Sequence, residues 1–347
     1  MDKINFLIEK TNILTAELNS IIQDMPKITE ENKINIEKIK NELNENIKTL
    51  KLETINLKNE INKPNLLING NFIINQRGKT EYTGSGTYTV DRWKFYGTGT
   101  LNVNSDNTIT YTIGSNNWNG ISYCIENPSF LSNKTFTVSI KGNSTAGIWL
   151  NFYQNGNNID GLYTTNSGNF YLTKTITFPE ILNTDKLIIA IVTRNTNMPE
   201  GITNNSFTLE YVKLEHGLTA TPLKSKTYEE ELNLCQRYYI SYKNKSNSVT
   251  MLLATTYFGQ ANYFWGHISL PTAMRTTPSI TYSNLGDISV VSGSGGTPTN
   301  LSSLSVTNQS HNILRLYGIA SGVSANKILA LQLNTGNSYL NFDAEIY

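Results

Sequence analysis

The sequence has little cysteine, little charge and no long hydrophobic run. Among its 347 residues only Cys124 and Cys235 are cysteines, too few for a disulfide framework or a four-cysteine zinc site, so we expect buried thiols. The N-terminal MDKINFLIEK contains acids and no apolar run of the length that a signal peptide or membrane helix needs. We therefore expect synthesis in a cytoplasm without a signal peptide, and no membrane insertion.

The sequence also lacks the recognisable motifs of enzymes and of nucleic-acid-binding proteins. The formal net charge is +1 with no basic block, which gives no case for nucleic acid as a partner. The histidines have no metal-ligand spacing, and no phosphate loop, dinucleotide fingerprint, nucleophile elbow or Ser/His/Asp order stands out. The sequence predicts no metal, no cofactor and no catalytic residue. The scattered histidines are His216, His267 and His311.

Residues 1–63 contain no glycine and almost no aromatic residue, but they carry a narrow apolar stripe. Its steps mostly alternate between three and four residues, which is typical of a coiled coil. Such a stripe remains exposed to water unless partner helices cover it. Its residues do not distinguish a coiled coil of two helices from one of three. One long helix packed on its own body remains the alternative. We call the stripe the seam: Ile4, Leu7, Leu14, Leu18, Ile21, Ile36, Ile39, Leu43, Ile47, Leu50, Leu57 and Ile61.

Pro26 interrupts the seam. Proline lacks a backbone N–H and clashes with the preceding helical turn. We expect one helix to end near Asp24 and a second to begin near Thr29, with a hinge between them. The coiled-coil stalk is therefore expected over residues 1–63, broken near Pro26.

After Pro64 the chain becomes rich in Asn, Thr, Ser, Gly and aromatic residues. Short alternating runs between turn residues predict an antiparallel β-sandwich over residues 64–217 and a second one over residues 241–347. Residues 218–240 would be a linker with a short helix, capped by Thr227 and Glu230. Leu187 to Val192 is nearly all apolar, as in a strand buried on both faces, and Trp93 is expected in the core.

Several segments resemble tail fibres of tailed bacteriophages. NLLINGNFIINQRG with DRWKF resembles the opening of a β-sandwich found in such fibres, and ISYCIENPSFLSNKTFTVSIKG resembles its middle strands, which look like a carbohydrate-binding jelly roll. KLEHGLTATPLKSKTYEEELNLCQRYY resembles the connector of these fibres. SLPTAMRTTPSITY and the closing DAEIY resemble parts of their C-terminal head domain. Together these segments cover most of residues 65–347.

The resemblance implies a mainly β fold with an N-terminal α-helical coiled coil, a jelly-roll-like sandwich body and a C-terminal β-sandwich head, in an intertwined homotrimer. It implies a receptor-binding protein in the virion tail of a phage, or in a phage-tail-like bacteriocin. The N-terminus would attach to a baseplate protein, and the particle would adhere to a bacterial cell-surface carbohydrate without enzymatic cleavage. A structural spacer without its own receptor, and a glycan-degrading tail depolymerase, are the alternatives.

Sugars bind to sites where aromatic rings stack on their C–H faces and amides bond their hydroxyls. Two predicted strands carry aromatic and polar side chains on one face and apolar side chains on the opposite face. The first set of candidates is Trp118, Trp149, Asn151 and Tyr153, and the second is Tyr257, Asn262, Tyr263, Trp265 and His267. The alternative for both sets is that these aromatic residues fill a trimer interface or a second core layer.

Overall fold

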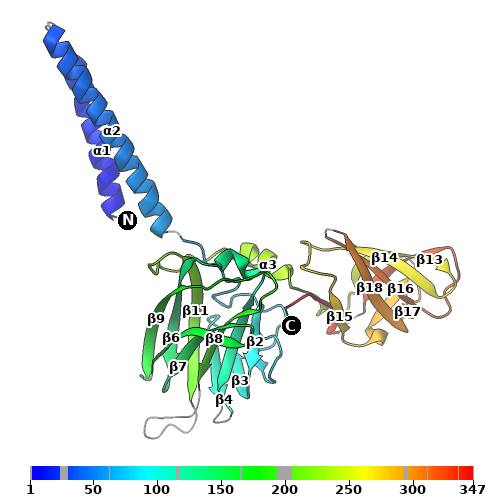
Figure 1. Cartoon of the computed structure of the whole chain (residues 1–347). Coiled ribbons are helices and arrows are strands. Elements are labelled where there is room, and N and C mark those ends of the chain that lie inside the picture. The colour runs from blue at the N-terminus through cyan, green and yellow to red at the C-terminus, as the bar shows by residue number, and fades with distance from the viewer. Residues whose placement is uncertain are drawn as a thin grey trace. The chain divides into compact units, whose positions relative to one another are not determined.

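The computed structural model of the chain describes residues 2–23, 30–61, 63–114, 118–164, 166–193, 205–292, 296–310, 312–334 and 336–346 (Figure 1). The fold is mainly β, with antiparallel sheets in sandwich arrangements, as the sequence predicts. The chain divides into two compact units. One comprises Met1–Pro64 and Thr219–Lys224, and the other comprises Asn65–Leu218 and Ser225–Tyr347.

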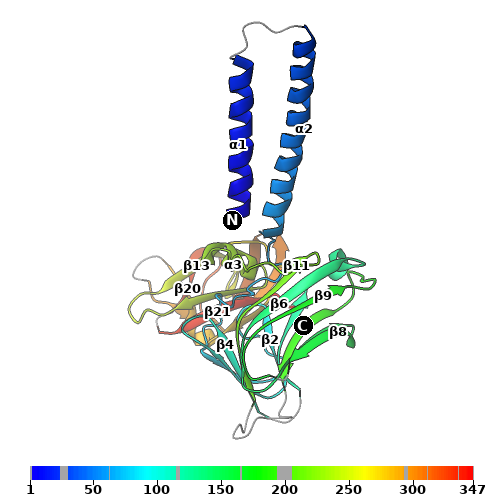
Figure 2. The ribbon, with the colours of Figure 1, turned by 90° about the vertical axis from the view of Figure 1, so that its left-hand side faces the viewer.

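The first unit contains two long helices, α1 (Asp2–Gln23) and α2 (Glu30–Ile61). They run antiparallel, side by side, in both ribbon views (Figure 2). The described helices end at Gln23 and begin at Glu30, close to the predicted bounds near Asp24 and Thr29, and the expected break at Pro26 lies outside the described residues. The reversal of direction was not predicted. None of the described helices is both long and apolar enough to cross a membrane.

The two helices cover the seam only in part. Ile4 is buried, and the other covered seam residues are half-buried: Leu7 and Leu18 on α1, and Ile36, Leu43, Ile47 and Leu50 on α2. Leu14, Ile21 and Ile39 remain 39%, 57% and 55% exposed. The side chains of Leu57 and Ile61 lie outside the described residues. A single chain therefore leaves much of the seam exposed to water. That helices of further copies cover it remains a prediction.

The first sandwich consists of two antiparallel sheets. The six-stranded sheet, in spatial order, contains β1 (Glu81–Tyr82), β3 (Gly99–Val103), β4 (Ile109–Ile113), β11 (Ser206–His216), β6 (Thr135–Ser144) and β9 (Gly168–Thr177). The five-stranded sheet contains β2 (Trp93–Tyr96), β5 (Asn119–Ile125), β10 (Leu187–Thr193), β7 (Ile148–Gln154) and β8 (Asn157–Thr164). This arrangement is jelly-roll-like. Its apolar core collects residues from both sheets and includes Phe95, Leu101, Tyr111, Phe136, Val138, Ile191 and Leu209.

Alternation along the strands determines which side chains enter this core. On β7 the side chains of Ile148, Leu150 and Phe152 are fully buried, as predicted. Trp93 on β2 is also fully buried, and its indole N–H donates to the Asn69 carbonyl oxygen at 2.9 Å. Successive strand residues point to opposite faces. The intervening residues of both strands therefore face away from the core.

The C-terminal sheets are separate from those of the first sandwich. A three-stranded sheet contains β12 (Tyr239–Asn244), β21 (Ser338–Asp343) and β15 (Ser279–Tyr282). A seven-stranded sheet contains β17 (Thr299–Asn300), β16 (Ile288–Val291), β20 (Lys327–Leu333), β13 (Met251–Gln260), β14 (Tyr263–Ser269), β19 (Ile313–Ile319) and β18 (Ser303–Ser310). They enclose a second apolar core that includes Ile240, Phe258, Phe264, Leu316 and Phe342.

Helix α3 (Tyr228–Gln236) begins with the predicted capping box. The Thr227 hydroxyl accepts from the Glu230 N–H at 3.2 Å, and the Thr227 N–H donates to the Glu230 carboxylate at 2.8 Å. The spacing of Tyr228, Leu232, Cys235 and Tyr239 predicts one helical face, which could dock on either β body or meet symmetry mates. In the structure Tyr228 is 53% exposed, and the helix ends at Gln236, so that Tyr239 lies on β12 instead. The buried residues of α3 are Glu231 and Cys235.

Both cysteines are free thiols. Cys235 is buried, as predicted, whereas Cys124 is only half-buried, contrary to the expectation of two buried thiols. Glu231 of α3 accepts a hydrogen bond from the Asn69 N–H, and Arg237, just after the helix, pairs with Glu126 at 3.0 Å. The connector helix is thereby fixed to the first sandwich.

The C-terminal segment also binds the first sandwich, through buried and half-buried charges that we call the arginine cluster: Arg77, Asp91, Arg92, Asp343 and Glu345. The Arg92 guanidinium donates to the Glu345 carboxylate and, at 2.9 Å, to the Cys124 carbonyl oxygen. Arg77 pairs with Asp91 at 3.1 Å, Glu345 at 3.4 Å and Asp343 at 3.9 Å. These side chains come from QRG, DRW and DAEIY, three segments that carried the sequence resemblance.

Candidate functional site

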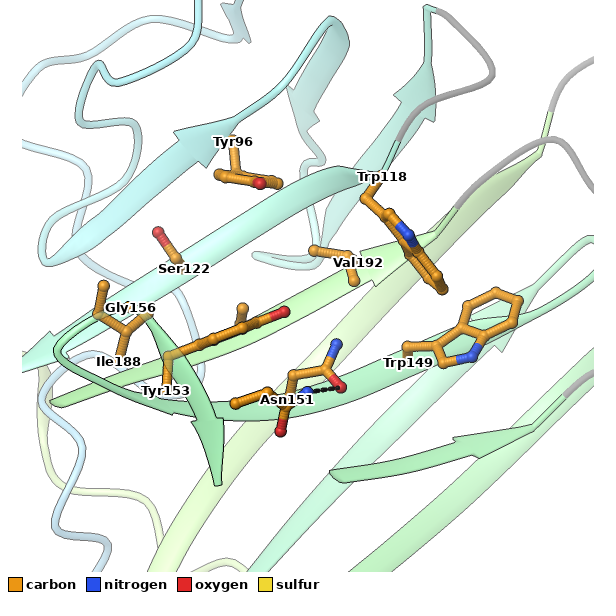
Figure 3. Close-up of a pocket in the computed structure, with 11 residues that line it drawn as sticks. Tyr96, Trp118, Ser122, Trp149, Asn151, Tyr153, Gly156, Ile188 and Val192 are labelled. Atoms are coloured by element: carbon orange, nitrogen blue, oxygen red, sulfur yellow. Dashed lines mark hydrogen bonds between the residues drawn. The ribbon is translucent and has the colours of Figure 1, made fainter. Parts of the chain in front are cut away.

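The outer face of the five-stranded sheet, away from the apolar core, carries a groove of about 500 Å³. Its lining residues come from β2, β5, β10, β7 and β8, with Trp118 from the loop before β5 and Gly156 from the turn between β7 and β8. They are Tyr96, Trp118, Ser122, Trp149, Asn151, Tyr153, Gly156, Asn158, Ile188, Ala190 and Val192 (Figure 3).

Small residues on the central strands make the groove hollow. In one cross-strand row Ser122 of β5 lies beside Ala190 of β10, and neither side chain projects far from the sheet. In the next row Gly120 lies beside Val192. A Cβ atom at Gly120 would lie 2.0 Å from the Ile191 carbonyl oxygen, so a larger residue would force the strands apart. The apolar outer residues of β10 form the floor, which explains why this strand is buried on both faces as predicted.

Aromatic rings stand on either side of this floor. Tyr96 of β2 and Trp149 of β7 occupy the same cross-strand row, separated by Gly120 and Val192. Three strand spacings of about 4.8 Å place their backbones roughly 14 Å apart. Figure 3 shows Trp118 and Trp149 together at one end, with Tyr153 toward the other and Tyr96 across the groove. The site thus has the width and the walls for a flat ring or a chain of rings.

The tryptophans form a compact aromatic cluster. The ring centroids of Trp118 and Trp149 are 4.8 Å apart with an interplanar angle of 85°. Trp149 also stacks on Tyr163 of β8, at 6.1 Å and 14°. These contacts hold the Trp149 ring in place, while Trp118 remains 37% exposed. A positioned but accessible aromatic face can stack on an apolar ring face of a ligand with little loss of side-chain entropy.

Polar groups in the groove are few and are located near its middle. The Asn158 amide donates to the Asn151 side-chain oxygen at 3.3 Å. Desolvation raises the pKa of Tyr153, and the neighbouring Tyr96 acts in the same direction. The Tyr153 hydroxyl therefore stays protonated near neutral pH and can donate or accept a hydrogen bond. Amides and hydroxyls between aromatic walls match the requirements of a polyhydroxylated ligand.

All four residues predicted for this first face line the groove: Trp118, Trp149, Asn151 and Tyr153. Sequence reasoning missed Tyr96 and Ser122. Tyr96 could have been found by alternation, since Trp93 and Phe95 point inward and place Tyr96 outward. Alternation with the buried Ile121 and Tyr123 also places Ser122 outward, but its position beside Ala190 depends on strand order, which the sequence does not show. Whether the groove binds a sugar remains a prediction.

The second predicted face lies on the seven-stranded sheet. On β14 Phe264 and Ile268 are buried, whereas Tyr263 and Trp265 are 55% and 39% exposed. The Trp265 ring lies 5.7 Å from Tyr257 and 5.6 Å from His267, and the Arg315 guanidinium carbon lies 5.4 Å from the Trp265 ring centroid. A depression of about 390 Å³ includes Tyr263, Trp265 and Arg315 among its lining residues. The alternation is confirmed, and ligand binding by this face remains a prediction.

Asn262 stabilises a turn between two strands of the same sheet. It occupies the turn between β13 and β14 with a φ of 71°, a left-handed conformation that asparagine tolerates. Its N–H donates to the Val323 carbonyl oxygen, and its side-chain oxygen accepts from the Gly322 N–H at 2.7 Å. These bonds account for an asparagine at this position without a ligand.

Neither a metal-holding cluster nor a carboxylate in the groove is found among the described residues. They contain no group of three or more His, Cys, Asp or Glu side chains placed to hold a metal ion, and His311 lies outside them. The described residues that line the groove contain no carboxylate. Glycoside hydrolysis generally uses two carboxylates flanking the bond. The groove as described offers walls and hydrogen bonds without such a pair.

No family model and no curated protein matches the sequence. Among solved structures, a CBM22-1–CBM22-2 tandem domain of Paenibacillus barcinonensis Xyn10C has a TM-score of 0.27 and 10% identity, over 72% of this chain and 91% of that one. A W1252A mutant of HCR D/C VPI 5995 scores 0.26 at 11% identity, over 81% and 96%. A Paenibacillus sp. cycloisomaltooligosaccharide glucanotransferase complexed with cycloisomaltoheptaose scores 0.23 at 9%, over 78% and 46%. Scores this low carry no functional argument, so the function rests on the geometry of the chain itself.

Proposed function

We propose that this chain is a receptor-binding fibre protein that attaches a phage tail, or a phage-tail-like particle, to a bacterial cell-surface glycan. The aromatic groove on the five-stranded sheet would be the binding site. The observation that carries the proposal is the combination of Trp118, Trp149 and Tyr153 as walls with a floor of small residues. Stacking walls with amides between them suit sugar rings, whose faces are apolar and whose edges are hydroxylated.

The binding would be non-enzymatic. The described lining residues supply no carboxylate to act as an acid, a base or a nucleophile on a glycosidic bond. The polar groups beside Trp149 are neutral amides and hydroxyls, which hold a sugar without activating it. Attachment without cleavage follows from such a lining.

Affinity would come from several copies acting together. The seam leaves Leu14, Ile21 and Ile39 exposed in one chain, and we propose that helices of further copies cover them in a homotrimer. The helical region would also contact a baseplate protein. Linked weak sites raise the effective concentration of each other, and gains of roughly 10² to 10⁴ over a single site are reasonable without new contacts.

Replacing one wall residue of the groove tests the proposal. We expect Trp149→Ala, in the full chain, to weaken binding to an array of bacterial surface polysaccharides at least fivefold per site, because truncating a central aromatic anchor costs about 1 kcal/mol or more. Trp265→Ala is the matched control, since it removes a surface tryptophan, 39% exposed, from the seven-stranded sheet. Circular dichroism would verify that both variants fold.

Loss of binding in Trp149→Ala alone would support the groove as the receptor site. Loss in Trp265→Ala alone would move the site to the seven-stranded sheet and refute the groove. If the folded wild-type oligomer bound no polysaccharide on the array and no bacterial cells, the adhesin proposal would be wrong, and a structural spacer would replace it. Release of reducing sugars from a bound polysaccharide would instead indicate a depolymerase.

A further inference from the structure

The wall of the groove along β7 carries an aromatic side chain at each of its two ends. Trp149 and Tyr153 lie four residues apart on this strand, and both line the groove. At about 3.3 Å per residue their backbones are about 13 Å apart. A single sugar ring is too short to lie against both side chains. Two sugars of one chain that stack on them therefore need at least one more sugar between them.

The middle of this wall is polar. Asn151 lies between the two aromatic residues on β7, as Figure 3 shows. Its cross-strand partner on β8 is Gly161, where a Cβ atom would lie 2.8 Å from the Asn151 side-chain oxygen. The glycine therefore leaves the space that the Asn151 amide occupies. An amide in this place can bond the hydroxyls of a sugar whose two neighbours are stacked on aromatic rings.

A β-bulge adds a second amide at the same place. The register between β7 and β8 shifts just before Tyr153, which pairs with Asn158 rather than with Ile159. Bulges of this kind change the direction in which a side chain points. Ile159 packs against the apolar core, whereas Asn158 lines the groove and donates to the Asn151 side-chain oxygen at 3.3 Å. The bulge thus replaces an isoleucine by an amide in the wall of the groove.

The floor of the groove follows this wall and is lowest in the middle. Ala190 of β10 lies beside Asn151, and its other cross-strand neighbour is Ser122 of β5. The outer residues of β10 at the two ends are larger, with Val192 beside Trp149 and Ile188 beside Tyr153. The hollow is therefore deepest where the wall is polar. A chain of sugars can be hydrogen-bonded at its middle and stacked at both ends.

We propose that the groove binds a linear saccharide of at least three sugars, which runs along β7 with its outer sugars against Trp149 and Tyr153 and its middle sugar at Asn151. This inference rests on the proposed function of the groove and adds the shape and the minimum length of the glycan. A monosaccharide occupies one of the three positions at a time. Each further sugar adds contacts without a second loss of translational freedom, so the affinity rises with chain length until all three positions are filled.

The test titrates the full chain with size-fractionated oligosaccharides of one to six sugars, prepared from the array polysaccharide that wild type binds. We expect the affinity of wild type to rise with each added sugar up to the trisaccharide at least. Tyr153→Ala should remove a gain of about fivefold between the disaccharide and the trisaccharide, the effect of losing one aromatic contact, and change the affinity for the monosaccharide less than about twofold. Tyr171→Ala is the matched control, since it removes a tyrosine, 51% exposed, from β9 of the six-stranded sheet.

The outcomes separate this inference from the proposed function. Full affinity for the monosaccharide in wild type, with binding still lost in Trp149→Ala, would overturn the three positions and retain the groove as a site for one sugar. The same length dependence in Tyr153→Ala as in wild type would overturn the alignment along β7, because Tyr153 would then contact no sugar. Binding of every oligosaccharide unchanged by Trp149→Ala would refute the groove itself. The length series in wild type needs no substitution, so the inference is tested even where a variant does not fold.

Discussion

Substituting Glu345 by glutamine tests the buried contact between the C-terminal segment and the first sandwich. Glutamine has nearly the same shape as glutamate, so the change removes the negative charge and little else. The Glu345 side chain is fully buried, and that of Arg92 is 1% exposed. After the substitution the Arg92 guanidinium would remain buried without its carboxylate.

Breaking a buried ion pair from one side costs about 3–5 kcal/mol, because an uncompensated charge stays behind. Two contacts of Arg92 survive in the variant: the hydrogen bond to the Cys124 carbonyl oxygen at 2.9 Å, and the Tyr238 ring, whose centroid lies 3.6 Å from the guanidinium carbon. Arg77 keeps its bond to Asp91 at 3.1 Å. We therefore expect a loss near the lower end, about 3 kcal/mol of unfolding free energy. That is a large part of the 5–15 kcal/mol typical of a domain.

Urea denaturation followed by tryptophan fluorescence measures this loss, since Trp93 is buried in the first sandwich. Glu210→Gln is the control: its carboxylate pairs with Lys141 at 2.6 Å, but the two side chains are 45% and 49% exposed. An exposed pair contributes at most about 1 kcal/mol. If Glu345→Gln lowered the unfolding free energy by no more than Glu210→Gln does, the arginine cluster would not hold the C-terminal segment as we argue.

Two further predictions concern the helices and the pH dependence of stability. Ile21→Asn with Ile39→Asn should dissociate the proposed homotrimer in sedimentation experiments and leave the β-sheet circular dichroism unchanged, whereas an oligomer that persists would place its interface outside the seam. Burial raises the pKa of Asp91 from 3.8 to about 7, although Arg77 acts in the opposite direction. The folded chain then holds a proton that the unfolded chain releases, so wild type should lose unfolding free energy relative to Asp91→Asn as the pH rises from about 4 to 7. A constant difference between the two proteins over this range would contradict the raised pKa.

Local sequence patterns were enough to predict the character of each segment and the face to which its side chains point. Period-two alternation placed Trp149, Asn151 and Tyr153 opposite a fully buried face. The seam and Pro26 predicted two helices with a break between them. These results follow from local geometry, since helices and strands repeat at fixed periods whatever they later contact.

The tertiary structure alone decided which of these faces come together. The groove is hollow because Ser122 and Ala190 lie side by side on strands far apart in sequence. Arg92 meets Glu345 across 253 positions, and no local pattern predicts that pairing. The seam likewise does not specify which helices cover it. In the structure α1 and α2 cover part of each other's seam residues. Sequence periodicity predicts which residues are buried, whereas strand order and long-range packing determine which residues they contact.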